Sequence, residues 1–167
     1  MITISTKKLE KVFDKQVIPN ITCIGLDTAS RTGWCTAKTN EKEVVFDYGW
    51  IEIDSNDKYF IYNRYVDIFH TLIETDKVVI EESFYSRNIK TFQMLSRIGA
   101  FAYAAAHLKK IKNKQFLLAT SARKYLGFKG NAKKDIIQKE FIEVLDLKID
   151  DNDIIDAMIL VLNGILK

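Results

Sequence analysis

The strongest constraint on the fold of this chain comes from two apolar segments that each end in acidic residues. The first is ITCIGLD, from Ile21 to Asp27, and the second is VVIEES, from Val78 to Ser83. Continuous apolar runs rich in β-branched residues are typical of strands that are covered on both faces. Such strands need helices on both sides of the sheet, so the pattern favours an α/β fold.

The rest of the chain predicts an antiparallel hairpin and a series of helices. The first run is followed by WCTAKT and VVFDYGWIEI, and the polar stretch Asn40–Glu43 between them indicates an antiparallel meander. A further strand is predicted for QFLLAT, at residues 115–120. Helices are expected over residues 57–74, 88–109 and 132–145, from residue 122 and after residue 150. We therefore predict an α/β fold with a mixed five-stranded sheet, an antiparallel edge hairpin and helices on both faces.

Length and composition fit one main domain. The chain has 167 residues, and 47% of them are hydrophobic, which is enough for a packed core. Residues 1–20 are expected to form an N-terminal extension, and residues 21–167 the main domain. Cys23 and Cys35 are expected to be reduced core thiols. No apolar run approaches the roughly 20 residues of a membrane span, which predicts a cytoplasmic protein with no membrane partner.

Four acidic residues stand next to strongly apolar sequence. Asp27 and Glu81 end two strands, and the carboxyl ends of parallel neighbours meet at one edge of a sheet. Asp153 and Asp156 are three residues apart and would share one face of a helix. Carboxylates that meet in this way repel one another, and a hard divalent cation such as Mg²⁺ or Mn²⁺ relieves the repulsion. Two such ions about 3.5–4 Å apart can activate a water for phosphodiester hydrolysis.

The acids also have plain structural interpretations. Asp153 can be a helix N-terminal acid that the macrodipole favours, and Glu81 can be a strand-end acid beside a loop. Asp156 is harder to explain in this way, because it precedes the apolar run AMILVL. The hypothesis of a metal site therefore depends on the four acids occurring together.

Positive charge is concentrated in one part of the sequence, although the formal net charge is only +3. The cations between residues 109 and 139 are Lys109, Lys110, Lys112, Lys114, Arg123, Lys124, Lys129, Lys133, Lys134 and Lys139. Asp135 is the only acid among them. Such a run can neutralise DNA phosphates on one face of a protein, or it can be an ordinary solvated surface.

Three segments resemble, in order, the motifs of the RuvC-type Holliday-junction resolvases of the RNase H-like superfamily. The family's opening motif is matched by GLDTASRTGW, the second by VVIEESFYSRN and the closing one by DNDIIDAMIL. The helix after the second motif is matched by LSRIGAFAYAAA. The resemblance extends from Ile21 to the C-terminus, and it implies an RNase H-like fold and a RuvC-like nuclease domain over residues 21–167.

The resemblance also implies roles for individual residues. The metal ligands, which are also catalytic, would be Asp27, Glu81, Asp153 and Asp156. Lys134 matches a catalytic lysine that approaches the scissile phosphate, and Phe84 an aromatic residue that stacks on a base at the strand exchange. The other expected DNA contacts are Arg87, Arg123, Lys124, Lys129 and Lys133.

The implied activity is that of a crossover junction endodeoxyribonuclease. It would hydrolyse Holliday junctions, with forks and other branched DNA as further candidate substrates, by a two-metal mechanism that uses Mg²⁺, with Mn²⁺ as a substitute. The family usually has a proline where this chain has Thr28. That departure and the N-terminal extension hint at a divergent, phage-borne member, cytoplasmic in a bacterial host. Nothing in the sequence indicates a docking surface for a branch-migration motor.

Paired nicks in a junction predict a two-fold homodimer, because one domain of this size carries one acidic cluster. The expected interface is the helix over residues 88–109, whose core face would carry Leu95, Ile98, Ala102 and Ala105. The opposite stripe, expected at the interface, is Phe92, Ser96, Gly99, Tyr103 and Ala106. This stripe can also pack within its own chain.

Three other functions share part of this pattern. A related RNase H-like nuclease with a different substrate would use the same acids. A non-catalytic junction-binding protein would keep the fold, but it would be expected to lack one of the acids. A phosphotransferase of the actin and sugar-kinase type also has a loop after its first strand, but it needs two such domains, for which 167 residues are too few.

Overall fold

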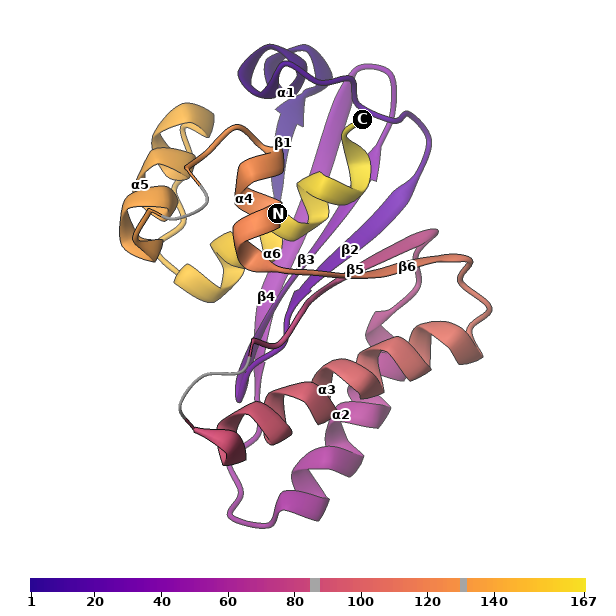
Figure 1. The fold of residues 1–167 in the computed structure, drawn as a ribbon. Helices are drawn as coiled ribbons and strands as arrows, with labels where there is room; N and C mark the ends of the chain where they lie inside the picture. The colour runs from indigo at the N-terminus through magenta and orange to yellow at the C-terminus, as the bar shows by residue number, and fades with distance from the viewer. Residues whose placement is uncertain (85–87, 130–131) are drawn as a thin grey trace.

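The computed structural model describes residues 1–84, 88–129 and 132–167 (Figure 1). The strands are β1 (Ile2–Ser5), β2 (Thr22–Asp27), β3 (Arg31–Thr39), β4 (Glu43–Glu52), β5 (Lys77–Glu81) and β6 (Asn113–Leu117). The helices are α1 (Thr6–Phe13), α2 (Lys58–Leu72), α3 (Ile89–Leu108), α4 (Ala119–Tyr125), α5 (Lys134–Leu145) and α6 (Asn152–Ile165). The strands form one mixed sheet in the order β1-β4-β3-β2-β5-β6.

The sheet confirms the predicted α/β fold with its antiparallel hairpin. β2, β3 and β4 are antiparallel neighbours, whereas β5 runs parallel to β2 and β6 parallel to β5. Asn40 stabilises the turn between β3 and β4, because its side chain accepts hydrogen bonds from the N–H groups of Lys42 and Glu43. The described sheet has six strands instead of the predicted five, since β1 pairs antiparallel with β4.

Residues 1–20 contribute to both the sheet and the core. β1 extends the sheet beyond β4, and α1 follows it directly. Phe13 of α1 is buried and its ring stacks on Phe141 of α5, with 6.4 Å between ring centroids. Gln16 and Lys167 exchange two backbone hydrogen bonds, of 3.0 and 2.9 Å. The segment is therefore packed against α5 and the end of α6.

Different helices cover the two faces of the sheet (Figure 1). α2 and α3 cover one face, where Ile24 and Ile80 of the central strands pack with Phe69 of α2. α6 lies on the other face with α4 and α5 outside it, and this core contains the buried free thiols of Cys23 and Cys35. The alternation of residues along β2 thus supplies both cores, as expected for a strand covered on both sides.

Two glycines allow α6 to approach the sheet closely. A Cβ atom at Gly25 of β2 would collide with the main chain of Ala157, and one at Gly33 of β3 would collide with the main chain of Asp153. Gly33 is also the β3 partner of Asp27. The N-terminal turn of α6 is therefore held next to the end of β2.

More of the surface of α3 is buried against its own chain than predicted. Its buried residues are Ile98, Gly99, Ala102, Ala105 and Ala106. A Cβ atom at Gly99 would lie 3.3 Å from the ring of Phe116 on β6, and Tyr103 stacks on the same ring at 5.5 Å between centroids. The predicted interface stripe is therefore not a free surface, because its small residues Gly99 and Ala106 are buried within the chain. Neither α3 nor any other helix in the described ranges is long and apolar enough to cross a membrane.

Candidate active site

Asp27 and Glu81 emerge at the same edge of the sheet. They end the parallel neighbours β2 and β5, in which Leu26 is in register with Ile80. Asp27 is only 7% exposed, and its burial and the charges of Glu81 and Asp156 raise its pKa well above the usual value. Burial and the charge of Asp156 likewise raise the pKa of Glu81. The three carboxylates thus form one electrostatic cluster.

Asp156 supplies the third carboxylate from α6, and side chains of α4 and α5 surround it. It is 4% exposed, and its Oδ1 lies 3.4 Å from Nη2 of Arg123, which is also buried. Its Oδ2 accepts a hydrogen bond of 3.2 Å from Nε2 of Gln138 and forms an ion pair with Nζ of Lys134. Cations and an amide of this chain therefore hold both oxygens of Asp156.

Lys134 stands at the first residue of α5 and faces the cluster. Burial disfavours its charged form, but the charges of Asp156, Asp27 and Glu81 outweigh this and raise its pKa. Its side chain is still about half exposed. The ammonium group is therefore charged at neutral pH, touches the cluster and remains accessible from solvent.

Asp153 is turned away from this cluster. It forms an ion pair with Nη1 of Arg31, and its charge has the smallest effect of those that raise the pKa of Asp27. The electrostatic cluster therefore contains Asp27, Glu81 and Asp156, whereas the side chain of Asp153 is paired with Arg31.

The oxygen donors at this site are of the kind that suits a hard cation. Two of the carboxylates, however, form ion pairs with basic side chains of the same chain. No cluster of three or more histidine, cysteine, aspartate or glutamate side chains in the described ranges is arranged to hold a metal ion. Lys134 and Arg31 engage two of the carboxylates instead. Two buried oxygens of the neighbouring residues, Thr28 Oγ1 and Gln138 Oε1, have no hydrogen-bond partner in the described structure. Carboxylate, hydroxyl and amide oxygens are ligands that suit Mg²⁺.

The predicted DNA contacts fall into three groups. Phe84 follows β5 and is 75% exposed, and Lys124, Lys129 and Lys133 are also exposed. Arg123 is instead buried and forms an ion pair with Asp156, one of the carboxylates of the acidic cluster. Arg87 lies outside the described residues.

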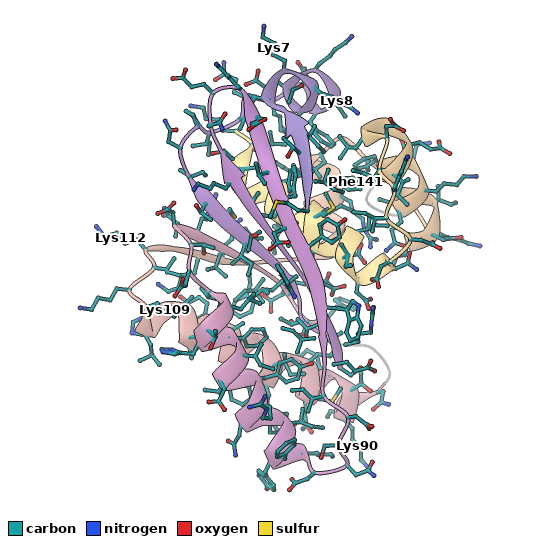
Figure 2. All side chains as sticks on the ribbon, turned by 180° about the vertical axis from the view of Figure 1, so that it is seen from behind. Lys7, Lys8, Lys90, Lys109, Lys112 and Phe141 are labelled. Carbon is teal, nitrogen blue, oxygen red and sulfur yellow. The ribbon has the colours of Figure 1, made fainter. Side chains whose placement is uncertain are left out.

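The basic run does not form one face. Lys114 lies near the start of β6, whereas Leu117, at the other end of that strand, is in register with Glu81. In Figure 2, Lys109 and Lys112 lie on the opposite side of the molecule from Phe141 of α5, the helix that begins with Lys134. The lysines of residues 109–114 are therefore separated from those around Lys134 (Figure 2), which favours the alternative that this part of the run is an ordinary solvated surface.

Sequence reasoning missed two residues that contact the acids. Arg31 lies inside GLDTASRTGW, and Gln138 ends the segment GFKGNAKKDIIQ. Gln138 bridges α5 and α6, because its Nε2 donates to the carbonyl of Asn152 at 3.1 Å as well as to Asp156. Both of these neighbours are acceptors, so the amide nitrogen must face them. The available signal was the spacing of four residues between Lys134 and Gln138, which places both side chains on the same face of a helix.

The fold is similar to that of solved RuvC-type Holliday-junction resolvases. The structure of Thermus thermophilus RuvC matches 87% of this chain and 98% of its own, with a TM-score of 0.69 and 14% identity. T. thermophilus RuvC in complex with a Holliday-junction substrate matches 84% of this chain and 90% of its own, with a TM-score of 0.65 and 12% identity.

A eukaryotic structure has the same fold. The yeast mitochondrial Holliday junction resolvase Ydc2 matches 92% of this chain and 81% of its own, with a TM-score of 0.59 and 13% identity. No protein-family model and no curated protein sequence matches the chain. The predicted structural resemblance is thus confirmed at the level of the fold.

Proposed function

We propose that this chain is a divalent-metal-dependent endonuclease that cuts branched DNA, with the Holliday junction as its main substrate and forks and other branches as further candidates. The observation that carries the proposal is the cluster of Asp27, Glu81 and Asp156, in which Asp27 and Asp156 are buried and Lys134 forms an ion pair with Asp156. The fold supports it, since a solved protein of this fold is in complex with a Holliday-junction substrate.

The acids would hold Mg²⁺, or Mn²⁺ in its place. Asp27, Glu81 and Asp156 are the proposed ligands, with Asp153 as a fourth. The bound ions would supply an activated water and stabilise the leaving oxygen of the phosphodiester. Burial, and after it the charges of the neighbouring carboxylates, raise the pKa values of Asp27 and Glu81, and a bound cation would offset both effects.

The chain's other residues would position the phosphate and the carboxylates. Lys134 can exchange Asp156 for the scissile phosphate, because its ammonium group is partly exposed, and it would stabilise charge that develops there in the transition state. Arg123 and Gln138 would keep Asp156 oriented when Lys134 leaves it.

DNA would be held by a stacking residue and exposed cations. Phe84 is available to stack on an unpaired base, and Lys124, Lys129 and Lys133 to contact phosphates. Arg87 is retained as a DNA contact from the resemblance alone.

A homodimer is part of the proposal, since symmetric paired nicks need two active sites. Its interface cannot use the whole stripe predicted for α3, because Gly99 and Ala106 are buried within the chain. We assign it to the outer face of α3 and the free edge of β6, where Ala100, Ala104, Tyr103 and Phe116 are exposed. Light scattering at micromolar concentration should give a mass of twice 19.3 kDa, and Ala104→Arg should give the monomer. A monomeric wild type, free and on a junction, would contradict the dimer.

One assay tests the proposed activity against its alternatives. Labelled four-way, forked, duplex and RNA–DNA substrates are incubated with the protein in Mg²⁺ or in EDTA. Cleavage of the four-way junction in Mg²⁺ alone is expected. Preference for the RNA–DNA hybrid would favour a related nuclease of different substrate, and tight junction binding without cleavage in either Mg²⁺ or Mn²⁺ would favour a non-catalytic binding protein.

A further inference from the structure

Arg31, the first residue of β3, binds two acids at the N-terminus of α6. Its Nη2 is 2.5 Å from Oδ2 of Asp151, and its Nη1 contacts Oδ1 of Asp151 at 3.2 Å and Oδ2 of Asp153. The guanidinium group also stacks over the ring of Trp50, 4.6 Å from the centroid. Hydrogen bonds to Asp151 and Asp153 raise its pKa further above an already high value, so deprotonation cannot break these pairs.

The contacts of Arg31 are divided unequally between the two acids. Asp151 is the N-cap of α6, where its Oδ1 accepts from the N–H groups of Asp153 and Ile154, and both of its oxygens contact Arg31. Asp153 makes a single contact with the guanidinium. Arg31 can therefore release Asp153 while it stays bound to Asp151 and stacked on Trp50.

Asp153 lies next to the candidate active site but is directed to β3. Its main chain packs on Gly33, the strand partner of Asp27. Its side chain is 26% exposed, compared with 4% for Asp156 one helical turn later. Two acids at helical spacing thus differ in their partners, and Arg31 accounts for the difference.

We propose that Arg31 is a positioning residue that holds Asp153 away from the other carboxylates and thereby weakens the binding of a second divalent cation. The inference rests on the proposed function, since it concerns the same metal site. A divalent cation and Arg31 compete for one carboxylate and repel each other, so each lowers the occupancy of the other. The planar guanidinium spans Asp151 and Asp153 together, which the compact ammonium of lysine cannot do.

Titration with Mn²⁺ alone, without DNA, tests this inference. Binding is measured by calorimetry and by the electron spin resonance of free Mn²⁺ for the wild type, Arg31→Gln, Arg31→Lys, Asp153→Asn and the double variant Arg31→Gln/Asp153→Asn. Arg64→Gln is the matched control, because it removes the same charge from a surface pair with Asp67 on α2. Thermal unfolding in EDTA checks that each variant folds.

The wild type should show one tighter and one weaker binding step. Arg31→Gln should tighten the weaker step about tenfold and leave the tighter step unchanged. Arg31→Lys should tighten it by a smaller factor, Arg64→Gln should change neither step, and both Asp153 variants should lose the weaker step.

Three results would overturn parts of the proposals. Unchanged Mn²⁺ affinity in both folded Arg31 variants would mean that Arg31 only fastens α6 to β3. Tightening that persists in the double variant would show that Asp153 is not the residue through which Arg31 acts. A wild type that binds no Mn²⁺, with or without junction DNA, would instead overturn the proposed function.

Discussion

The two ends of the parallel strands carry charge in different ways. At the carboxyl end, Asp27 and Asp156 are buried, Glu81 is partly buried beside them, and Lys134 forms an ion pair with Asp156. At the amino end, the lysines of residues 110–112 are exposed beside the start of β6. The two ends differ in solvent exposure, because Asp27 and Asp156 are buried and Lys110 and Lys112 are exposed. A buried charge needs a partner or a ligand, whereas an exposed charge is already solvated. Only the carboxyl end therefore indicates a catalytic or metal-binding site.

The largest effect is expected from neutral variants of the carboxyl-end acids. Asp27→Asn, Glu81→Gln or Asp156→Asn should each lower junction cleavage by about a thousandfold or more, because the amide keeps the shape but loses the charge that would hold the cation. Single-turnover cleavage and gel-shift binding measure the two effects, and binding should change little. Asp67→Asn, on the exposed face of α2, is the control. Wild-type rates in any of the three variants would falsify the assignment.

A smaller loss, of about a hundredfold in rate, is expected for Lys134→Ala. The reason is that its charge would act on the transition state more than on the bound junction. The rate at saturating protein is compared with the dissociation constant. Lys124→Ala is the control, with weaker binding and an unchanged rate. Equal losses in rate and binding for Lys134→Ala would reduce it to an ordinary phosphate contact.

The same acids predict how stability depends on pH when no metal is present. Asp27 and Glu81 have pKa values raised by burial, so the folded state binds their protons more strongly than the unfolded state does. Their contribution to stability is therefore present at acidic pH and is lost as pH rises through the raised pKa values. In EDTA, the melting temperature should fall by a few degrees over this range. Asp27→Asn should flatten the dependence, and an unchanged slope would contradict the burial of this charge.

The smallest effect is expected at the amino end. Replacing Lys110 and Lys112 together by glutamine should leave cleavage within about twofold and the salt dependence of binding unchanged. By contrast, Lys129→Ala should reduce the slope of log affinity against log salt by about one, as expected for the loss of one phosphate contact. A lower slope of log affinity against log salt for the variant without Lys110 and Lys112 would mean that DNA also contacts the amino end of the sheet. The proposed difference between the two ends would then be wrong.

The sequence predicted the central strands and their acids because the signals there are local. The apolar runs before Asp27 and Glu81 specify buried strands, and a parallel pair brings their ends together. The spacing of Asp153 and Asp156 correctly predicted one helix. It could not predict that they have different partners, since Arg31 lies about 120 residues away in the chain.

Other failures have a common cause in long-range packing. Gly99 and Ala106 permit close approach of any backbone, and the sequence does not say whether the neighbour is a second copy or the sheet. β1 has only four residues, too few for a clear alternation, and its partner β4 is distant in sequence. Gln138 lies on α5 with ordinary helical spacing, and only the packing of α5 against α6 shows its contact with Asp156.

The backbone pairing of Gln16 with Lys167 has a consequence for the order of folding. It joins segments from opposite ends of the sequence, and Val17 forms a β-bridge with Leu166 beside it. Contacts of such long sequence separation carry a large loop-closure cost and form late. During synthesis, α1 emerges before α6 and could complete its packing only after α6 has emerged. The apolar side of α1 would therefore remain partly uncovered until the last helix is made.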